Sequence, residues 1–464
     1  MQNSLLKPQH PRLQLREKLA YGVGDIGSNL VYIPLSTFAL FYFTDIAGIG
    51  AAMAGGILLA GQLLNGVSDL LIGYLIDRTR TRWGKARPWI LGTSIPLAVS
   101  LVAMFSVPAS LDQTGRAIWA LVSYTLVTAV FFTASNVAYS ALMSIMTLDA
   151  KSRVTLATFR FFAALLTGLV VNIATLPLVT SFGTGQTGWT TTIALYAFLT
   201  VAALCTVFFG TRERVIAGED RENSVRQPTR LLVRSLTHNR FFFLAAALFL
   251  LFYLSNTLGS AGGIYLASDV LGDPSLFGLL SAAQLLPPLI LIGFMPKFIS
   301  RYGKRRMFLI GIAVMFVGTA VVLIDPTNAP LVVSSAVVRG IGLVPLTAGI
   351  FALVGDVVDY GEWRFGVRTD GLIYSSVVFG QKLGSGVGGA LAGALLAAGG
   401  YAAGASQQTP EAIQAILAVS FYVPLIAIAA MAIVVWFIRI ERYAPEVHAH
   451  LEARASSVQV SEER

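Results

Sequence analysis

Long apolar segments separated by short polar ones run through the whole sequence. A helix needs about 20 mostly apolar residues to cross a bilayer. Twelve segments meet this requirement, and they cover residues 19–43, 51–76, 88–108, 117–147, 155–180, 189–210, 241–269, 275–299, 306–325, 331–357, 371–399 and 411–440. The segments are continuously apolar, whereas the strands of a membrane barrel alternate in short runs of about ten residues. The pattern therefore predicts twelve transmembrane helices.

The longest polar stretch, residues 211–240, separates the first six apolar segments from the last six. A short repeat supports this division: Gly-Lys-Ala-Arg (84–87) follows the second segment, and Gly-Lys-Arg-Arg (303–306) follows the eighth. Paired bundles of this kind are typical of secondary transporters. We expect an all-α integral membrane protein with two six-helix bundles, 19–210 and 241–440, an N-terminal segment 1–18, a central loop 211–240 and a tail 441–464.

Composition and charge agree with a membrane protein. Charged residues make up 12% of the chain and hydrophobic residues 55%, which excludes an ordinary soluble domain. All but four of the 33 basic residues lie on one side of the predicted helices. The positive-inside rule places both termini and the central loop in the cytoplasm, as expected for a multi-pass protein of a bacterial inner (plasma) membrane. The net charge of +9 therefore reflects orientation rather than nucleic-acid binding.

One carboxylate lies in the middle of the second apolar segment. An ionisable group at this depth is costly unless it is paired or hydrated, so Asp69 is a functional candidate. Asn65 lies one helical turn earlier on the same face, and Ser68 is adjacent. With Thr133 of the fourth segment, these residues form a candidate cation site. Asp69 could bind Na⁺, or desolvation could let it carry a proton.

Two other segments carry polar stripes at helical spacing. Asp25, Ser28, Asn29 and Tyr32 share a face of the first segment, and Thr133, Asn136 and Ser140 share a face of the fourth. Such stripes can bind a polar substrate or join helices by hydrogen bonds. Arg160 on the fifth segment and Lys382 on the eleventh offer donors for hydroxyls or a carboxylate, and could pair with Asp69 or Asp25 when the site is empty.

Several motifs resemble those of one family. They include Tyr-Gly-Val-Gly-Asp-Ile-Gly-Ser-Asn (21–29), Asp-Arg-Thr-Arg-Thr-Arg-Trp-Gly-Lys-Ala-Arg-Pro-Trp (77–89), Asn-Val-Ala-Tyr-Ser-Ala-Leu (136–142), Phe-Gly-Thr-Arg-Glu-Arg (209–214) and Gly-Asp-Val-Val-Asp-Tyr-Gly-Glu-Trp (355–363). They resemble the glycoside–pentoside–hexuronide:cation symporters of the major facilitator superfamily, which include the melibiose carrier. The resemblance spans about residues 15–445 and implies symport of a sugar or sugar acid.

The resemblance also implies roles for the polar residues. The face of the melibiose carrier that corresponds to Asp69 has two carboxylates, but the first is Asn65 here, so we favour H⁺ over Na⁺ as the coupling ion. Asn29 and Asn136 align with two acidic sugar-binding residues of that carrier, which argues against melibiose as the substrate. Arg160 and Lys382 match basic residues of the family and are expected at the substrate site.

Charges near the basic side suggest a gate. We expect ion pairs between the two bundles to hold the transporter closed on that side, with Asp149 meeting the turn at 304–306 and the acids of the tenth segment facing the turn at 78–87. The expected gate residues are Arg78, Lys85, Asp149, Arg306, Asp356, Asp359 and Glu362. Arg339, in the tenth segment, could extend outward to the interface or bind an acidic substrate.

Other functions fit less well. A symporter of an amphiphile such as a lysolipid would need a mostly apolar cavity, and a membrane sensor would need an output module beyond the short tail. No nucleophile–base or metal-ligand motif indicates an enzyme, and with one cysteine and four histidines we expect neither a disulfide nor a metal site. We expect no cofactor beyond the coupling ion. The expected partners are the sugar and the lipid bilayer, with no nucleic acid or obligate protein partner.

Overall fold

The computed structural model describes residues 13–147, 149–214, 237–366, 369–405, 407–447 and 449. Within these residues the regular structure is helical, apart from one isolated bridge between Thr81 and Gly84. Residues 1–12, 215–236, 448 and 450–464, which belong to the expected N-terminal segment, central loop and tail, lie outside the described residues. The chain divides into two units, Met1–Ser224 and Val225–Arg464.

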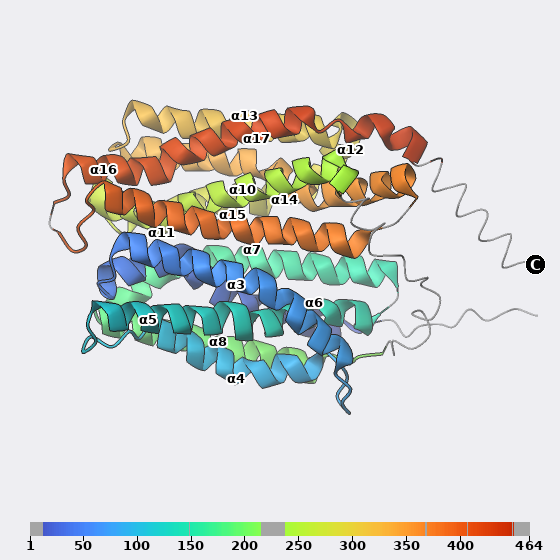
Figure 1. The fold of residues 1–464 in the computed structure, drawn as a ribbon, viewed down its shortest axis with the longest axis horizontal. Coiled ribbons are helices and arrows are strands. Elements are labelled where there is room, and N and C mark those ends of the chain that lie inside the picture. The colour runs from blue at the N-terminus through green and yellow to red at the C-terminus, as the bar shows by residue number, and fades with distance from the viewer. Residues whose placement is uncertain are drawn as a thin grey trace, which may run out of the picture. The chain divides into compact units, whose positions relative to one another are not determined.

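The long helices of the first unit run alongside one another (Figure 1). They are α1 (Leu15–Ile33), continued by η1 (Pro34–Phe38), α2 (Ala39–Phe41) and η2 (Tyr42–Ile46); α3 (Ala51–Arg78); α4 (Arg87–Met104); α5 (Gln113–Thr125), joined through η3 (Leu126–Phe132) to α6 (Thr133–Met146); α7 (Ala150–Ser181); and α8 (Gln186–Gly210). Helix α1 packs against α7 and α8, and α4 packs against α6 and α8.

The second unit has the same plan. Its helices are α10 (Arg240–Tyr265), continued by η4 (Leu266–Val270); α11 (Leu276–Leu291), followed by η5 (Ile292–Phe294) and α12 (Met295–Tyr302); α13 (Lys304–Val321) with η6 (Val322–Ile324); α14 (Ala329–Phe365); α15 (Asp370–Ala398); and α16 (Pro410–Leu417), joined through η7 (Ala418–Tyr422) to α17 (Val423–Phe437), with η8 (Ile440–Tyr443) beyond. Helix α10 packs against α15 and α17, and α13 packs against α14 and α17.

The predicted fold class is confirmed. Eleven helices in the described part of the chain are long and apolar enough to cross a membrane. Helix α15, 29 residues long, is a further long helix and carries the polar run Gly-Gln-Lys-Leu-Gly-Ser-Gly. The observed bounds agree closely with the expected ones, except that α14 continues to Phe365, well beyond the expected end at 357.

The two units repeat each other in detail. At the far end of the first helix of each unit, a π-helical turn carries a hydroxyl residue followed by an aspartate. Thr44 Oγ1 donates to Asp45 Oδ2 over 2.6 Å, and Ser268 Oγ donates to Asp269 Oδ2 over the same distance. Asp45 and Asp269 are therefore equivalent positions of the two units. Other pairs of residues described below are separated by the same number of positions.

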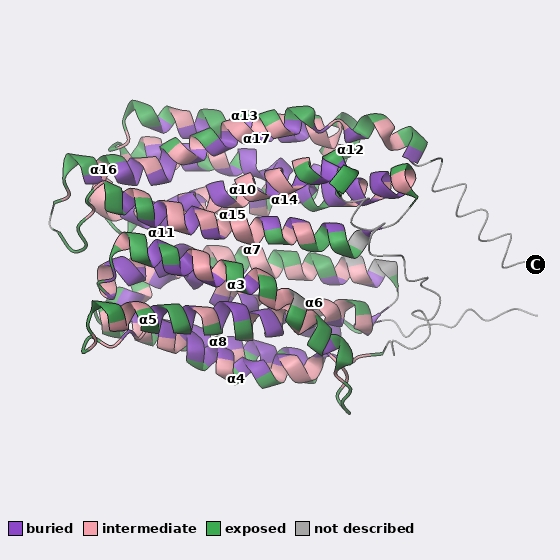
Figure 2. Cartoon of the chain, in the orientation of Figure 1, coloured by how far each residue is buried: buried purple, intermediate pink, exposed green. Residues whose placement is uncertain are grey.

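Burial does not follow apolarity, because large apolar side chains such as Ile324, Phe198 and Ile426 are exposed, as a lipid-facing surface allows. Within each unit, buried residues form stripes along the helices, and exposed residues occupy other faces and the ends (Figure 2). Several helices begin at a side chain that accepts a hydrogen bond from a first-turn backbone amide, which satisfies donors that have no partner within the helix. These N-cap residues are Asp112, Asp149, Asn239, Asn328 and Thr409.

Candidate functional site

A buried ion pair links the first and fifth spans. Nε of Arg160, on α7, lies 2.9 Å from Oδ1 of Asp25, on α1. The Asp25 side chain is 7% exposed and that of Arg160 27%, so one side of the pair is accessible and the other is packed. Because isolated charges at this depth are costly, each group stabilises the other. The sequence placed both residues at the substrate site and gave Asp25 as one of two possible partners for Arg160.

Two more of the expected substrate residues belong to this pair. Asn29 Nδ2 donates to Asp25 Oδ2 over 3.1 Å, so both carboxylate oxygens have a partner. Arg160 Nη1 donates to Ser140 Oγ, on α6, over 3.2 Å. The result is a group of four polar side chains from α1, α6 and α7, which supplies paired donors and acceptors of the kind that vicinal hydroxyls require.

Two stacked tyrosine rings pack against the guanidinium of Arg160. The sequence analysis did not include them among the site residues. The guanidinium carbon of Arg160 lies 4.9 Å from the centre of the Tyr139 ring. Tyr139 stacks on Tyr21 with ring centres 4.6 Å apart, and its hydroxyl donates to the Tyr21 carbonyl over 2.6 Å. Both rings are buried. Tyr21 lies four residues before Asp25, and Tyr139 lies next to Ser140, so their sequence positions contained the signal.

The expected cation-site residues are joined across α3, η3 and α6. Thr133 Oγ1 donates to Asn65 Oδ1 over 2.6 Å, and Ser68 Oγ donates to the Ala129 carbonyl. Asn65 is buried, whereas Asp69, one turn further along α3, is half-buried. Gln62 continues the network by donating to the Tyr124 hydroxyl over 3.3 Å. No cluster of three or more His, Cys, Asp or Glu side chains suited to a metal ion occurs among the described residues.

The remaining substrate candidates have separate surroundings. Ser28 is buried and donates to the Gly24 carbonyl of its own helix over 3.1 Å, which is the helix-stabilising use of a polar stripe. The Tyr32 ring stacks near Phe132, with centres 6.2 Å apart. Asn136 is half-buried on α6, and Lys382 is half-buried on α15 in the second unit.

Two glutamates make the same contact in the two units. Glu213 accepts hydrogen bonds from the backbone amides of Lys85, Ala86 and Arg87 at 2.8–3.0 Å, where α4 begins. Glu441 accepts from the amides of residues 304 and 305, where α13 begins. The repeated glycines that precede these helices, at 84 and 303, have φ of +103° and +84°, and a side chain on either would collide with the glutamate. The Gly-Lys repeat in the sequence is therefore a binding loop for a carboxylate.

The expected gate residues have partners that the sequence analysis did not assign. Lys304 Nζ lies 2.6 Å from Asp356 Oδ2 within the second unit, and Asp149 accepts a bond from the Ser152 amide at the start of α7. Glu362 is buried, at 2% exposure. Each of these contacts lies within one unit, and the expected pairs between the bundles stay a prediction. Among the other gate candidates, Arg78 and Arg306 are exposed and Asp359 is half-buried.

The Arg339 side chain does not extend outward to the interface, which was the first of two expectations for it. Its side chain packs on Gly318 of α13, and its guanidinium carbon lies 5.5 Å from the centre of the Phe421 ring, which is fully buried. Its Nε is buried and has no hydrogen-bond partner among the described residues. The side chain is therefore directed into the second unit.

Comparisons with known proteins identify the family of the whole chain. The family model described as MFS/sugar transport protein matches residues 20–442. The chain is 30% identical to the isoprimeverose transporter of Lactiplantibacillus pentosus, over 94% of this chain and 91% of that protein. It is 31% identical to the inner membrane symporter YicJ of Escherichia coli (strain K12), over 91% of each chain, and 29% identical to the glucuronide carrier protein homolog of the same organism, over 92% and 93%.

Solved structures share the fold at low sequence identity. The nucleoside transporter NupG has a TM-score of 0.60 at 15% identity, over 90% of this chain and 99% of that one. A bacterial homologue of the human drug peptide transporters PepT1 and PepT2 has a TM-score of 0.62 at 10% identity, over 94% and 99%.

The protein is thus a multi-pass membrane transporter and not an enzyme. It belongs to the MFS/sugar transport protein family, and its resemblance to the glycoside–pentoside–hexuronide:cation symporters is confirmed.

Proposed function

We propose that the protein is a symporter that couples the transport of a glycoside, pentoside or hexuronide to a cation by alternating access, with H⁺ favoured over Na⁺. The observation that carries the proposal is the Asp25–Arg160 pair with Asn29 and Ser140 around it. A sugar presents several hydroxyls that each donate and accept hydrogen bonds, and this group offers both functions at one place. The named sugar substrates of the relatives support the same class of substrate.

The coupling ion is proposed from the charge of the cation site. The hydroxyls of Ser68 and Thr133 donate to other oxygens and keep their lone pairs, so these contacts suit either ion and the charge decides. Asn65 replaces a carboxylate, so Asp69 contributes the single negative charge of this face. One carboxylate in an apolar span is well suited to bind and release a proton.

Orientation and gating complete the proposal. The positive-inside rule favours a cytoplasmic location for both termini. Cation and sugar would bind together, and their binding would lower the cost of closing one side of the site while the other opens. Exposed Arg78 and Arg306 remain candidates for ion pairs between the units, together with Asp359. Since single surface pairs contribute only ~0–1 kcal/mol, they would have to act as a network.

Uptake into proteoliposomes tests this function. Purified protein is reconstituted, and a panel of radiolabelled glycosides, pentosides and uronic acids is offered under an imposed pH gradient or an imposed Na⁺ gradient. We expect one class of sugar to accumulate under the pH gradient in Na⁺-free buffer. Accumulation under the Na⁺ gradient alone would contradict the choice of ion, and failure of every sugar under both gradients would contradict the substrate class.

Two single variants distinguish the cation site from the sugar site. Asp69→Asn should abolish accumulation but leave sugar exchange across the membrane, because exchange needs no net movement of the cation. Arg160→Gln should abolish both, because it removes a sugar-binding group. If Asp69→Asn accumulates sugar as the wild type does, Asp69 is not the coupling residue.

A further inference from the structure

Two grooves lie at equivalent places in the two units. The first, of about 730 Å³, runs between the start of α1 and the end of α8, and residues Leu15, Arg16, Leu19, Ala20, Val23, Cys205, Thr206, Phe209 and Gly210 line it. The second, of about 570 Å³, runs between the start of α10 and the end of α17, and residues Arg240, Phe243, Leu244, Phe437 and Arg439 line it. Each groove thus lies between the first and the last spanning helix of its unit.

Four of the five residues that line the second groove are equivalent in position to residues that line the first. The offset that pairs Asp45 with Asp269 also pairs Arg16 with Arg240 and Leu19 with Phe243. The offset that pairs Glu213 with Glu441 also pairs Phe209 with Phe437. An arginine and a phenylalanine thus recur at equivalent positions of two grooves that lie at the same place in the repeat, which indicates a feature common to both units.

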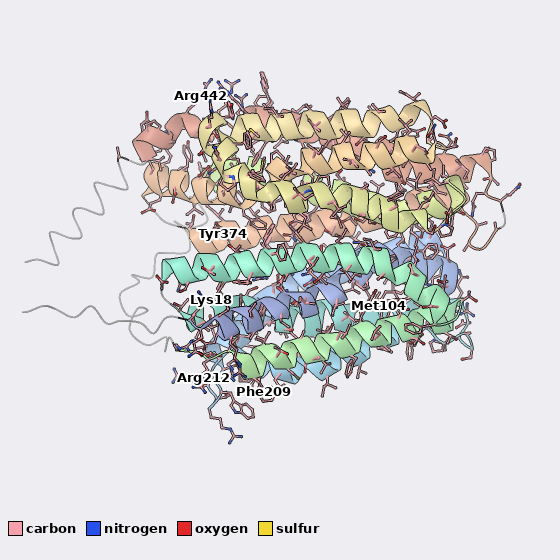
Figure 3. All side chains as sticks on the ribbon, turned by 180° about the vertical axis from the view of Figure 1, so that it is seen from behind. Lys18, Met104, Phe209, Arg212, Tyr374 and Arg442 are labelled. Atoms are coloured by element: carbon pink, nitrogen blue, oxygen red, sulfur yellow. The ribbon has the colours of Figure 1, made fainter. Side chains whose placement is uncertain are left out.

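The chemistry of both grooves is that of an amphiphile site. Large apolar side chains open to the surrounding medium, with Phe209 at 74% exposure, Phe437 at 60% and Phe243 at 53%. An arginine stands at the helix start in each case, and both Arg16 and Arg240 are exposed. Figure 3 shows Phe209 beside the charged residues Lys18 and Arg212 at the same end of the first unit. An apolar channel that ends at a guanidinium complements an acyl chain joined to a negative headgroup.

We propose that each groove binds one anionic phospholipid, with an acyl chain along the apolar lining and the headgroup phosphate on the arginine. On the orientation proposed above, both grooves open to the cytoplasmic leaflet, where anionic lipids attract arginine side chains by about 1 kcal/mol each. The groove of the second unit binds more tightly, because Arg439 adds a second cation at the position that Thr211 holds in the first unit.

The arginine of the second groove is held in place for this role. Arg240 Nη2 donates to the Tyr443 hydroxyl over 2.9 Å, and its guanidinium carbon lies 4.8 Å from the centre of the Phe241 ring. A guanidinium has five donors, so these contacts orient it and leave donors for a phosphate. Arg240 also lies in the first turn of α10, where backbone amides and the helix dipole favour a negative group.

Native mass spectrometry of the detergent-solubilised full-length protein tests the proposal, and it does not depend on whether the transport function is correct. Phosphatidylglycerol and phosphatidylcholine with identical acyl chains are titrated separately, and the lipid-bound fractions are counted. We expect tighter binding of phosphatidylglycerol. The double variant Arg240→Ala/Arg439→Ala should weaken it about 25-fold at one site, Arg439→Ala alone about fivefold, and Arg16→Ala about fivefold at the other site.

Arg301→Ala is the matched control, since Arg301 is an exposed arginine outside both grooves. It should change binding less than twofold. Leu244→Trp gives a second test that keeps every arginine, because a bulkier side chain fills the groove and should lower binding of both lipids there. The proposal is overturned if both lipids bind equally to the wild type, or if Arg301→Ala weakens binding as much as the groove variants.

Discussion

The hydroxyl of Thr133 donates to Asn65 Oδ1 over 2.6 Å and so joins α6 to α3 one turn from Asp69. Ser140, two turns further along α6, accepts from Arg160. One helix therefore contacts both the proposed cation site and the proposed sugar site. A shift of α6 on sugar binding would change the contact between Thr133 and Asn65. This contact offers a physical route for coupling the two sites.

Replacing Thr133 tests that route. Thr133→Val removes the hydroxyl, leaves Asn65 Oδ1 without this donor, and should lower the apparent cation affinity about fivefold, the effect of about 1 kcal/mol. Thr133→Ser keeps the donor and should behave like the wild type. The measurement is the proton concentration at half-maximal sugar uptake. Equal values for all three proteins would mean that the contact plays no part in coupling.

Breaking the Asp25–Arg160 pair should remove sugar binding. Asp25→Asn takes the counter-charge from a partly buried guanidinium, and the loss of a desolvated charge pair at a binding site costs about 2–5 kcal/mol. We expect at least about 30-fold weaker sugar binding by isothermal titration. Asp45→Asn changes a carboxylate at the far end of the same span and should leave binding unchanged. Wild-type affinity in Asp25→Asn would exclude the pair from the sugar site.

The two capping glutamates should matter for stability in both units. Glu213→Ala and Glu441→Ala each leave helix-start amides without an acceptor, and hydrogen bonds to a charged group contribute about 1.5–3 kcal/mol. Each variant should lower the apparent melting temperature in detergent. Glu446→Ala removes an exposed carboxylate close to Glu441 in sequence and serves as the control. A melting temperature that stays the same in the Glu213 and Glu441 variants would show that the contacts are not stabilising.

Arg339 offers a test of a different kind. Arg339 is half-buried, and its buried Nε lacks a partner in the described chain, which costs free energy because this donor has lost its water. We expect Arg339→Met to retain or raise the melting temperature. If uptake of uronic acids alone is lost in this variant, Arg339 binds the substrate carboxylate. A clear fall in melting temperature would contradict the expectation.

The helices were predictable from sequence because a bilayer imposes one requirement, a long apolar run, on every span. The contacts of the site were predictable only in part. Arg160 finds Asp25 because few partners exist for a charge at that depth. The same argument could not foresee that Lys304 pairs with Asp356, since charges near the surface have many possible partners.

The π-helical turns were not predictable, and they change which residues share a face. Thr133 Oγ1 also donates to the Thr128 carbonyl, five residues earlier, across the wide turn η3. An argument from spacings of three and four residues assumes a regular helix and fails across such a turn. The stripe of Thr133 and Ser140 lies after this turn, in the regular helix α6, so the two residues contact α3 and α7 because different helices lie beside the two ends of the stripe.

The central claim, proton-coupled sugar symport through Asp69, is tested most directly with a pH electrode. De-energised cells that express the protein in Na⁺-free medium receive each sugar of the panel, and external pH is followed for the wild type and for Asp69→Asn. We predict that one sugar makes the medium of the wild type alkaline and leaves that of the variant unchanged. Alkalinisation of equal size in both would contradict the role of Asp69. Sugar uptake without any change in pH would contradict proton coupling itself.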